Sequence, residues 1–220
     1  MLESVNVGTA LPNPYKADLS TGIGKRAAQG SVAVRDPGPR LGGLGSGLVG
    51  DFVGDRAHHG GSEQAVYAFA REDLDDWQTR LNRELSNGFF GENLSTRGLD
   101  VSAARIGERW RIGTSVELQV TGPRTPCATF RGWVDERGWL KMFTEVARPG
   151  AYLRVLVPGS ITAGDEIDIV HRPDHAVTVS LVYRALLTAP KLLPELLAAG
   201  ADLPEEIREL ALATQPAPLD

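Results

Sequence analysis

The residues best suited to carry chemistry lie in the stretch Gly122-Pro123-Arg124-Thr125-Pro126-Cys127, which holds the only cysteine of the chain. Apolar and polar residues alternate over 116–121, which predicts a strand, and the two prolines predict that it ends in a stiff, extended loop. Arg124 lies three residues before the cysteine, and a nearby cation favours the thiolate, the form that binds metals and attacks electrophiles. The sequence therefore predicts a functional Cys127. The alternative is a small buried hydrophobic side chain.

A second group of candidates surrounds a pair of histidines. His58 and His59 precede a Gly60-Gly61 turn. Adjacent histidines are poor joint ligands for one metal ion, so either is interpreted as a proton donor or an anion contact. The alternative is a turn histidine with a satisfied hydrogen bond. Lys25 follows Gly22 and Gly24 and could meet an anion through close backbone approach, or could simply be solvated.

Composition limits the class of protein. Hydrophobic residues make up 42% of 220 residues, which is enough for a core, and the net charge of −5 argues against nucleic-acid or anionic-membrane partners. A single cysteine cannot form an internal disulfide, which fits a reducing compartment. The N-terminus lacks the layout of a signal peptide, and no apolar run approaches the roughly 20 residues that span a bilayer. We therefore expect a cytoplasmic protein.

The elements that must position these residues are mostly short strands. We expect strands at 2–9, 31–34, 64–69, 116–121, 152–157, 166–170 and 176–183, one more beginning at Trp110, and helices at 71–85 and 138–146. Two further helices are expected at 188–200 and from Asp202, which would be the N-cap with Glu205 completing a capping box. The prediction is a mainly β (α+β) fold, with a β domain at 1–183 and a helical appendage at 184–220. The apolar faces of that appendage need a partner surface, either the β domain or a second chain in a homodimer.

Several short motifs occur in order along the chain. They are His58-His59-Gly60-Gly61 with Ala65-Val66-Tyr67, Phe90-Gly91-Glu92-Asn93-Leu94, Ile106-Gly107-Glu108-Arg109 and Pro123-Arg124-Thr125-Pro126-Cys127. Together they resemble the MOSC domain, which is the C-terminal domain of molybdenum cofactor sulfurases and also occurs as a stand-alone protein. Arg172-Pro173, Thr178-Val179 and the terminal helices resemble the three-helix extension of the bacterial branch that detoxifies N-hydroxylaminopurine.

The resemblance implies a distorted β-barrel-like fold and a molybdenum cofactor, in which a pyranopterin dithiolene holds the metal. Cys127 would be the protein ligand to molybdenum, and Lys25, Arg124, Gly60 and Gly61 would hold the pterin phosphate. The remaining roles fall to neighbouring motif residues: proton donation to His59 or His58, and orientation of substrate or cofactor to Glu92 and Asn93.

The function implied is reduction of small N-hydroxylated compounds, with electrons from a separate flavin or iron–sulfur protein, because one cysteine cannot hold a cysteine-ligated cluster. Two alternatives stay open. One is a sulfur carrier with a Cys127 persulfide, and the other is a non-catalytic module that binds the molybdenum cofactor. The family is also associated with pyridoxal phosphate binding.

Overall fold

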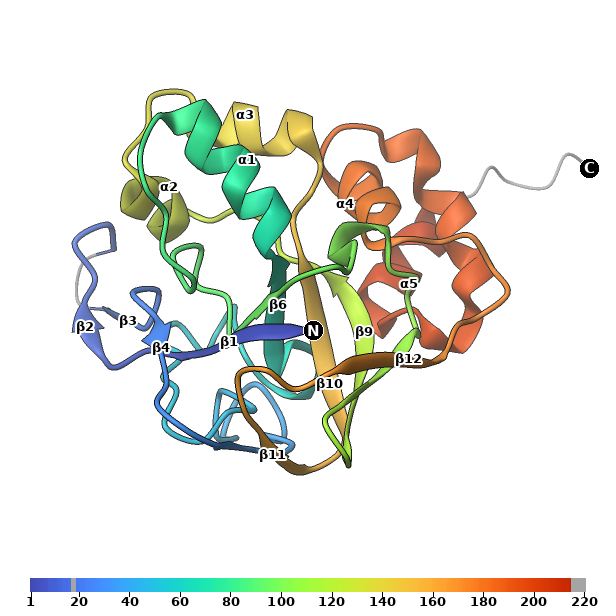
Figure 1. The fold of residues 1–220 in the computed structure, drawn as a ribbon. Coiled ribbons are helices and arrows are strands. Elements are labelled where there is room, and N and C mark those ends of the chain that lie inside the picture. Colours follow the sequence, from blue (N-terminus) through green and yellow to red (C-terminus); the bar gives the residue numbers. More distant parts are fainter. Residues whose placement is uncertain (17–18, 215–220) are drawn as a thin grey trace, which may run out of the picture.

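One open sheet of eight strands forms the centre of the computed structural model, which describes residues 1–16 and 19–214 (Figure 1). From edge to edge the strands are β12 (Ile167–His171), β8 (Arg109–Ile112), β9 (Val116–Pro123), β10 (Ala151–Val157), β6 (Val66–Ala70), β7 (Leu94–Thr96), β1 (Leu2–Val7) and β4 (Arg26–Ala27). Neighbours are antiparallel except β6 and β7, which are parallel and are connected through helix α1 (Arg71–Leu81). Because β12 and β4 are the two ends of this order, the sheet does not close into a barrel. The α+β class with C-terminal helices is confirmed.

Short elements complete the β region. Strands β2 (Leu11–Pro12) and β3 (Ser20–Thr21) pair with each other, as do β5 (Val32–Val34) and β11 (Gly159–Ile161). Single 3-10 turns occur at η1 (Ser62–Gln64) and η2 (Val101–Ala103). No helix in the described ranges is long and apolar enough to cross a membrane.

Strand β9 shows how the sheet obtains its core. Val116, Leu118 and Val120 alternate along the strand and are all fully buried. They belong to one apolar cluster that also contains Trp110 of β8 and Leu196 of the C-terminal helices. Burial of each such side chain stabilises the fold by about 1.5–3 kcal/mol. The loop that carries Cys127 therefore leaves a strand that is held firmly on both sides.

A second core is mainly aromatic and lies under the three helices at one end of the sheet, α1, α2 (Ala128–Val134) and α3 (Trp139–Val146) (Figure 1). Phe90 and Phe130 meet edge to face with ring centroids 5.2 Å apart, and Trp77 lies 4.6 Å from Trp139. Edge-to-face contacts add to the energy of burial itself. This packing holds α2, which begins directly after Cys127 and which the sequence did not predict.

The C-terminal segment differs from the prediction. It consists of α4 (Val179–Leu187), the 3-10 helix η3 (Pro190–Asp202) and α5 (Glu205–Ala213). The strand predicted at 176–183 is wrong, because the Thr178 side chain caps a helix by accepting the N–H of Leu181 at 3.1 Å. The buried residues Val179, Val182 and Tyr183 then follow helical spacing.

The predicted capping box at Asp202 is also wrong. Helix α5 begins at Glu205 after Pro204 and has no side-chain cap, while the Asp202 carboxylate accepts a hydrogen bond from Gln119 Nε2 at 3.2 Å. A carboxylate engaged by the sheet is not available to the helix end. Likewise, the helix predicted at 71–85 ends at Leu81, because Asn82 adopts a left-handed conformation.

The C-terminal helices share a core with the sheet. Leu193, Leu196 and Ala199 of η3 are buried in the same cluster as Ile106 and Trp110. The predicted domain boundary at residue 183 falls inside α4, and the division into 1–183 and 184–220 stays a prediction.

Candidate functional site

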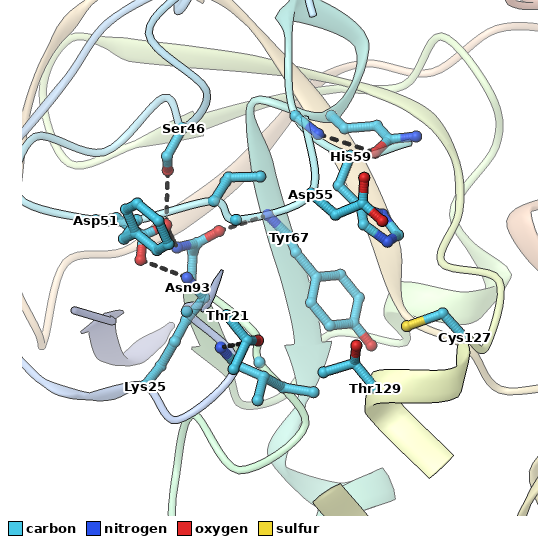
Figure 2. Close-up of a pocket in the computed structure, with 18 of the residues that line it drawn as sticks. Thr21, Lys25, Ser46, Asp51, Asp55, His59, Tyr67, Asn93, Cys127 and Thr129 are labelled. Carbon is cyan, nitrogen blue, oxygen red and sulfur yellow. Dashed lines mark hydrogen bonds and ion pairs between the residues drawn. The ribbon is translucent and has the colours of Figure 1, made fainter. Parts of the chain in front are cut away.

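A cavity of about 120 Å³ brings Cys127 together with residues from several other parts of the chain. Figure 2 shows Lys25, Ser46, Asp51 and Asn93 on one side in this view, and Asp55, His59 and Cys127 on the other, with the Tyr67 side chain between them. Tyr67 belongs to β6 and Cys127 immediately precedes α2. The sheet and the aromatic core therefore fix both sides of the cavity.

Cys127 is half-buried in an extended conformation, with φ −120° and ψ 173°, as the flanking prolines predicted. Burial by itself raises the pKa of its thiol. A hydrogen bond with His59 and the positive charge of Arg124 outweigh that effect and lower the pKa to about 6, against an ordinary value of 9.0. The thiolate is therefore the main form at neutral pH.

Arg124 provides a buried positive charge next to the thiolate. Its side chain is 7% exposed, and its guanidinium lies 4.0 Å from the ring centroid of Phe130 and 5.5 Å from that of Tyr67. Its Nη1 atom is buried and has no hydrogen-bond partner among the described residues. Leaving a buried charged donor without an acceptor is costly. The site is therefore built to receive an acceptor, and an anionic one is favoured.

The two histidines have different surroundings. His59 lines the cavity and contacts Cys127, whereas the His58 side chain is 69% exposed and its Nδ1 lies 3.0 Å from the Asp55 carboxylate. Lys16 also donates to Asp55 at 2.7 Å, and hydrogen bonds from Lys16 and His58 lower the pKa of Asp55 to about 2. Of the two predicted proton donors, only His59 is placed at the thiol.

Lys25 lines the cavity but already has a partner. Its ammonium forms an ion pair with the Asp51 carboxylate, and its side chain is only 7% exposed. Asp51 also accepts the backbone N–H of Gly8 at 2.8 Å, the Ser46 hydroxyl at 2.7 Å and the Asn93 amide at 2.9 Å. Lys25 is thus part of the cavity wall, and Asp51 neutralises its charge. It is not the solvated lysine that was one alternative from the sequence.

The other predicted site residues separate into lining and supporting positions. Asn93 lines the cavity, but its side chain is engaged by Asp51 and by the backbone N–H of Tyr67 at 3.1 Å. Glu92 is fully buried and is not part of the lining, because it accepts the N–H groups of Gly88 and Phe90 and the Ser95 hydroxyl.

Gly60 lines this cavity, whereas Gly61 lines a neighbouring one. Both residues have positive φ, as a tight turn requires.

Two further glycines allow the wall to form. A Cβ at Gly54 would lie 1.8 Å from the Ser20 carbonyl oxygen, and one at Gly22 would lie 2.0 Å from that of Phe52. The segments around 20–22 and 52–54 therefore cross in direct backbone contact.

The sequence analysis missed Asp51 and Asp55, and the only local signal was a run of glycine and aspartate before the histidines.

Together, these groups can bind a ligand that carries negative charge and contains a metal to which the thiolate sulfur can bind. A thiolate suits a soft metal centre, and a buried guanidinium suits a phosphate or another oxyanion. The residues present therefore fit a metal cofactor that carries its own anionic groups.

Comparison with known proteins gives the family. A profile of the MOSC domain matches residues 55–168, which is more than half of the chain. The chain is 29% identical over 182 residues to protein YflK of Bacillus subtilis, covering 82% of this chain and 78% of YflK. It is 32% identical over 144 residues to a protein named reductase from Gibberella moniliformis, covering 64% of this chain and 26% of that protein.

The fold comparison agrees. The solved structure of YiiM from Geobacillus stearothermophilus matches with a TM-score of 0.75 at 23% identity, covering 97% of both chains. YiiM from Escherichia coli matches with a TM-score of 0.69 at 22% identity, covering 98% of this chain and 94% of that one. The matched residues 55–168 contain His59, Arg124 and Cys127, and on this evidence the chain belongs to the MOSC domain family.

Proposed function

We propose that this protein binds the molybdenum cofactor through Cys127 and reduces N-hydroxylated compounds, such as hydroxylaminopurines and hydroxylamines, to amines. One observation carries the proposal: a thiolate with a pKa of about 6 shares a cavity with a buried guanidinium nitrogen that has no partner in the described part of the chain. MOSC membership and the relative named reductase support the same reading.

Each residue would have a defined task. Cys127 would supply the protein's sulfur ligand to the metal, and Arg124 would pair with an anionic group of the cofactor. His59 would stabilise the thiolate form of Cys127 through their hydrogen bond. The Lys25–Asp51 pair would shape the wall without adding net charge. When bound, the cofactor would supply the two-electron chemistry that this protein's side chains lack.

The overall reaction takes one substrate molecule, two electrons and two protons, and gives one amine and one water. The N–O bond breaks, a new N–H bond forms, and the oxygen leaves as water. A separate flavin or iron–sulfur protein would deliver the electrons. His59 is the proposed proton donor, because an imidazole can carry and transfer a proton and its ring lies at the thiolate.

A sulfur-carrier role is the alternative that the site also favours. Cys127 is half-buried rather than fully enclosed, and its thiolate can attack the outer sulfur of a persulfide on a desulfurase. The new S–S bond makes a Cys127 persulfide, and the desulfurase cysteine leaves as a thiolate. This role needs the same reactive sulfur but no bound metal. The two functions therefore differ in metal content.

The test is metal analysis of protein from a host that makes the molybdenum cofactor. Wild type should contain about one molybdenum per chain, and Cys127→Ser should lose most of it, since a hydroxyl is a poor ligand for a soft metal. Loaded wild type with an artificial low-potential donor should convert N-hydroxylaminopurine to adenine. Equal molybdenum and equal turnover in both proteins would refute the proposal, and a Cys127 persulfide in metal-free protein would favour the carrier.

A further inference from the structure

A second cavity, of about 540 Å³, is lined in part by the segment that leads to Cys127. Its walls come from the turn at Gly60 and Gly61, from the end of β9 at Gly122, and from Leu186 and Ile207 of the C-terminal helices. Its volume falls within the roughly 300–1,000 Å³ typical of small-molecule sites. The segment predicted to be an appendage thus forms part of a cavity.

The two cavities are built on the same residues. Gly60, Gln64 and Tyr152 line both of them. Along the loop, Gly122, Pro123 and Thr125 line the second cavity, while Arg124 and Cys127 line the first. A ligand in the second cavity would therefore rest against the segment that carries the thiolate.

The charges around the second cavity cancel in pairs. Its charged lining residues, all of them within the described ranges, are Arg40, Glu63, Glu205 and Glu206. Arg40 pairs with Glu206 at 3.0 Å, Glu63 with Arg154 at 2.9 Å, and Glu205 with Arg208 at 2.6 Å. No lining charge is left over to attract a phosphate or an ammonium group. The ligand that fits is uncharged.

The lining also favours a ligand with apolar surface. It combines backbone without side chains, at Gly60, Gly61 and Gly122, with the apolar side chains of Leu186 and Ile207. Removal of the apolar surface of a ring system from water by such a lining is favourable.

We propose that the second cavity binds the uncharged heteroaromatic ring system of the substrate, so that the C-terminal helices belong to the substrate site. This inference rests on the proposed reductase function, because it assigns the part of the substrate that does not react. It goes beyond that function by naming the surface that would select a purine-like substrate over hydroxylamine itself.

Gly122→Val is the decisive variant. Among the residues that the structure describes, the only heavy atom within 4 Å of a Cβ at Gly122 is Ile207 Cδ1, at 3.9 Å, and Gly122 is not in the left-handed region. A β-branched residue also suits a strand, so the added carbons should enter the cavity without strain. Ala33→Val is the matched control, because Ala33 is an exposed strand residue that does not line either cavity.

The first readout is calorimetric binding of adenosine to cofactor-free protein. Wild type and Ala33→Val should bind adenosine equally, Gly122→Val should bind at least about tenfold more weakly, and AMP should bind no tighter than adenosine. If Gly122→Val does not fold, as judged by circular dichroism, Ile207→Phe fills the same space from α5. Undetectable adenosine binding, unchanged binding in both cavity variants, or markedly tighter binding of AMP would overturn the inference.

The second readout separates this inference from the proposed function. In loaded protein, Gly122→Val should raise KM for N-hydroxylaminopurine about tenfold, leave KM for hydroxylamine unchanged, and retain wild-type molybdenum content. An unchanged KM for both substrates would overturn the inference and leave the reductase function standing. Adenosine binding that is lost in Gly122→Val, in a protein that never holds molybdenum, would support the cavity assignment while the reductase function failed.

Discussion

Replacement of His59 by alanine should raise the pKa of the Cys127 thiol. Burial raises that pKa, and the hydrogen bond with His59 and the charge of Arg124 more than compensate for it. The variant removes the hydrogen bond and the smaller coulombic contribution of His59. It leaves the charge of Arg124 in place, because Arg124 is held separately over the ring of Phe130. The thiolate should therefore become less stable while the rest of the cavity is preserved.

The size of the effect follows from the hydrogen bond. A hydrogen bond to a charged group contributes about 1.5–3 kcal/mol, and one pKa unit corresponds to about 1.4 kcal/mol, so the pKa should rise by about 1–2 units. Starting from a pKa of about 6, the thiolate fraction at neutral pH should fall from about 0.9 to about 0.1–0.5.

The assay is the pH dependence of alkylation by iodoacetamide in cofactor-free protein, followed by intact mass. The chain has one cysteine, so every alkylation event reports on Cys127. The midpoint of the pH profile is the quantity to compare, because the intrinsic nucleophilicity of a thiolate rises with its pKa and distorts rates at a single pH.

His58→Ala is the matched control. His58 is the adjacent histidine, but its side chain is exposed and pairs with Asp55, so its loss should leave the midpoint in place. A wild-type midpoint near the ordinary value of 9.0, or an equal rise in both histidine variants, would refute the reasoning.

Three further predictions concern stability. Asp51→Ala should cost about 3–5 kcal/mol in urea unfolding, because it leaves Lys25 buried without its partner; a double variant with Lys25→Met that is no more stable would contradict this. Gly54→Ala should lower the free energy of unfolding by at least about 1–3 kcal/mol, since its Cβ would lie 1.8 Å from the Ser20 oxygen, and a neutral result would exclude that contact. Burial raises the pKa of Asp73 from 3.8 to about 6. Between pH 3.8 and about 6, the Asp73 carboxyl therefore stays protonated in the folded state and is ionised in the unfolded state. The free energy of unfolding should therefore decrease as pH rises through that window, by at most about 1.4 kcal/mol per unit, and Asp73→Asn should flatten the slope.

The strands and the Cys127 loop could be predicted because their signals are local. Alternation over 116–121 and two prolines specify a strand followed by an extended turn, and both are present around Cys127. A helix was also predicted at 138–146, and α3 spans Trp139–Val146. These features depend on residues within a few positions of each other, which a linear sequence displays.

The segment at 176–183 shows where local pattern fails. Its apolar residues satisfy both strand alternation and helical spacing, so periodicity alone cannot choose between them. The Thr178 cap and the burial of Val182 and Tyr183 favour the helix, and both depend on the tertiary fold around this segment.

The sequence by itself determined the family and the α+β class, and it predicted Cys127 as the centre of the candidate site. Only the tertiary structure decided that His59 rather than His58 meets the thiol, that Lys25 is neutralised, and that the C-terminal helices line a second cavity. The physical reason is separation along the chain. Lys25 lies 26 positions from Asp51, and Asn93 lies 42 positions from it. A side chain's charge state and hydrogen-bond partners depend on neighbours in space, and folding alone brings those neighbours together.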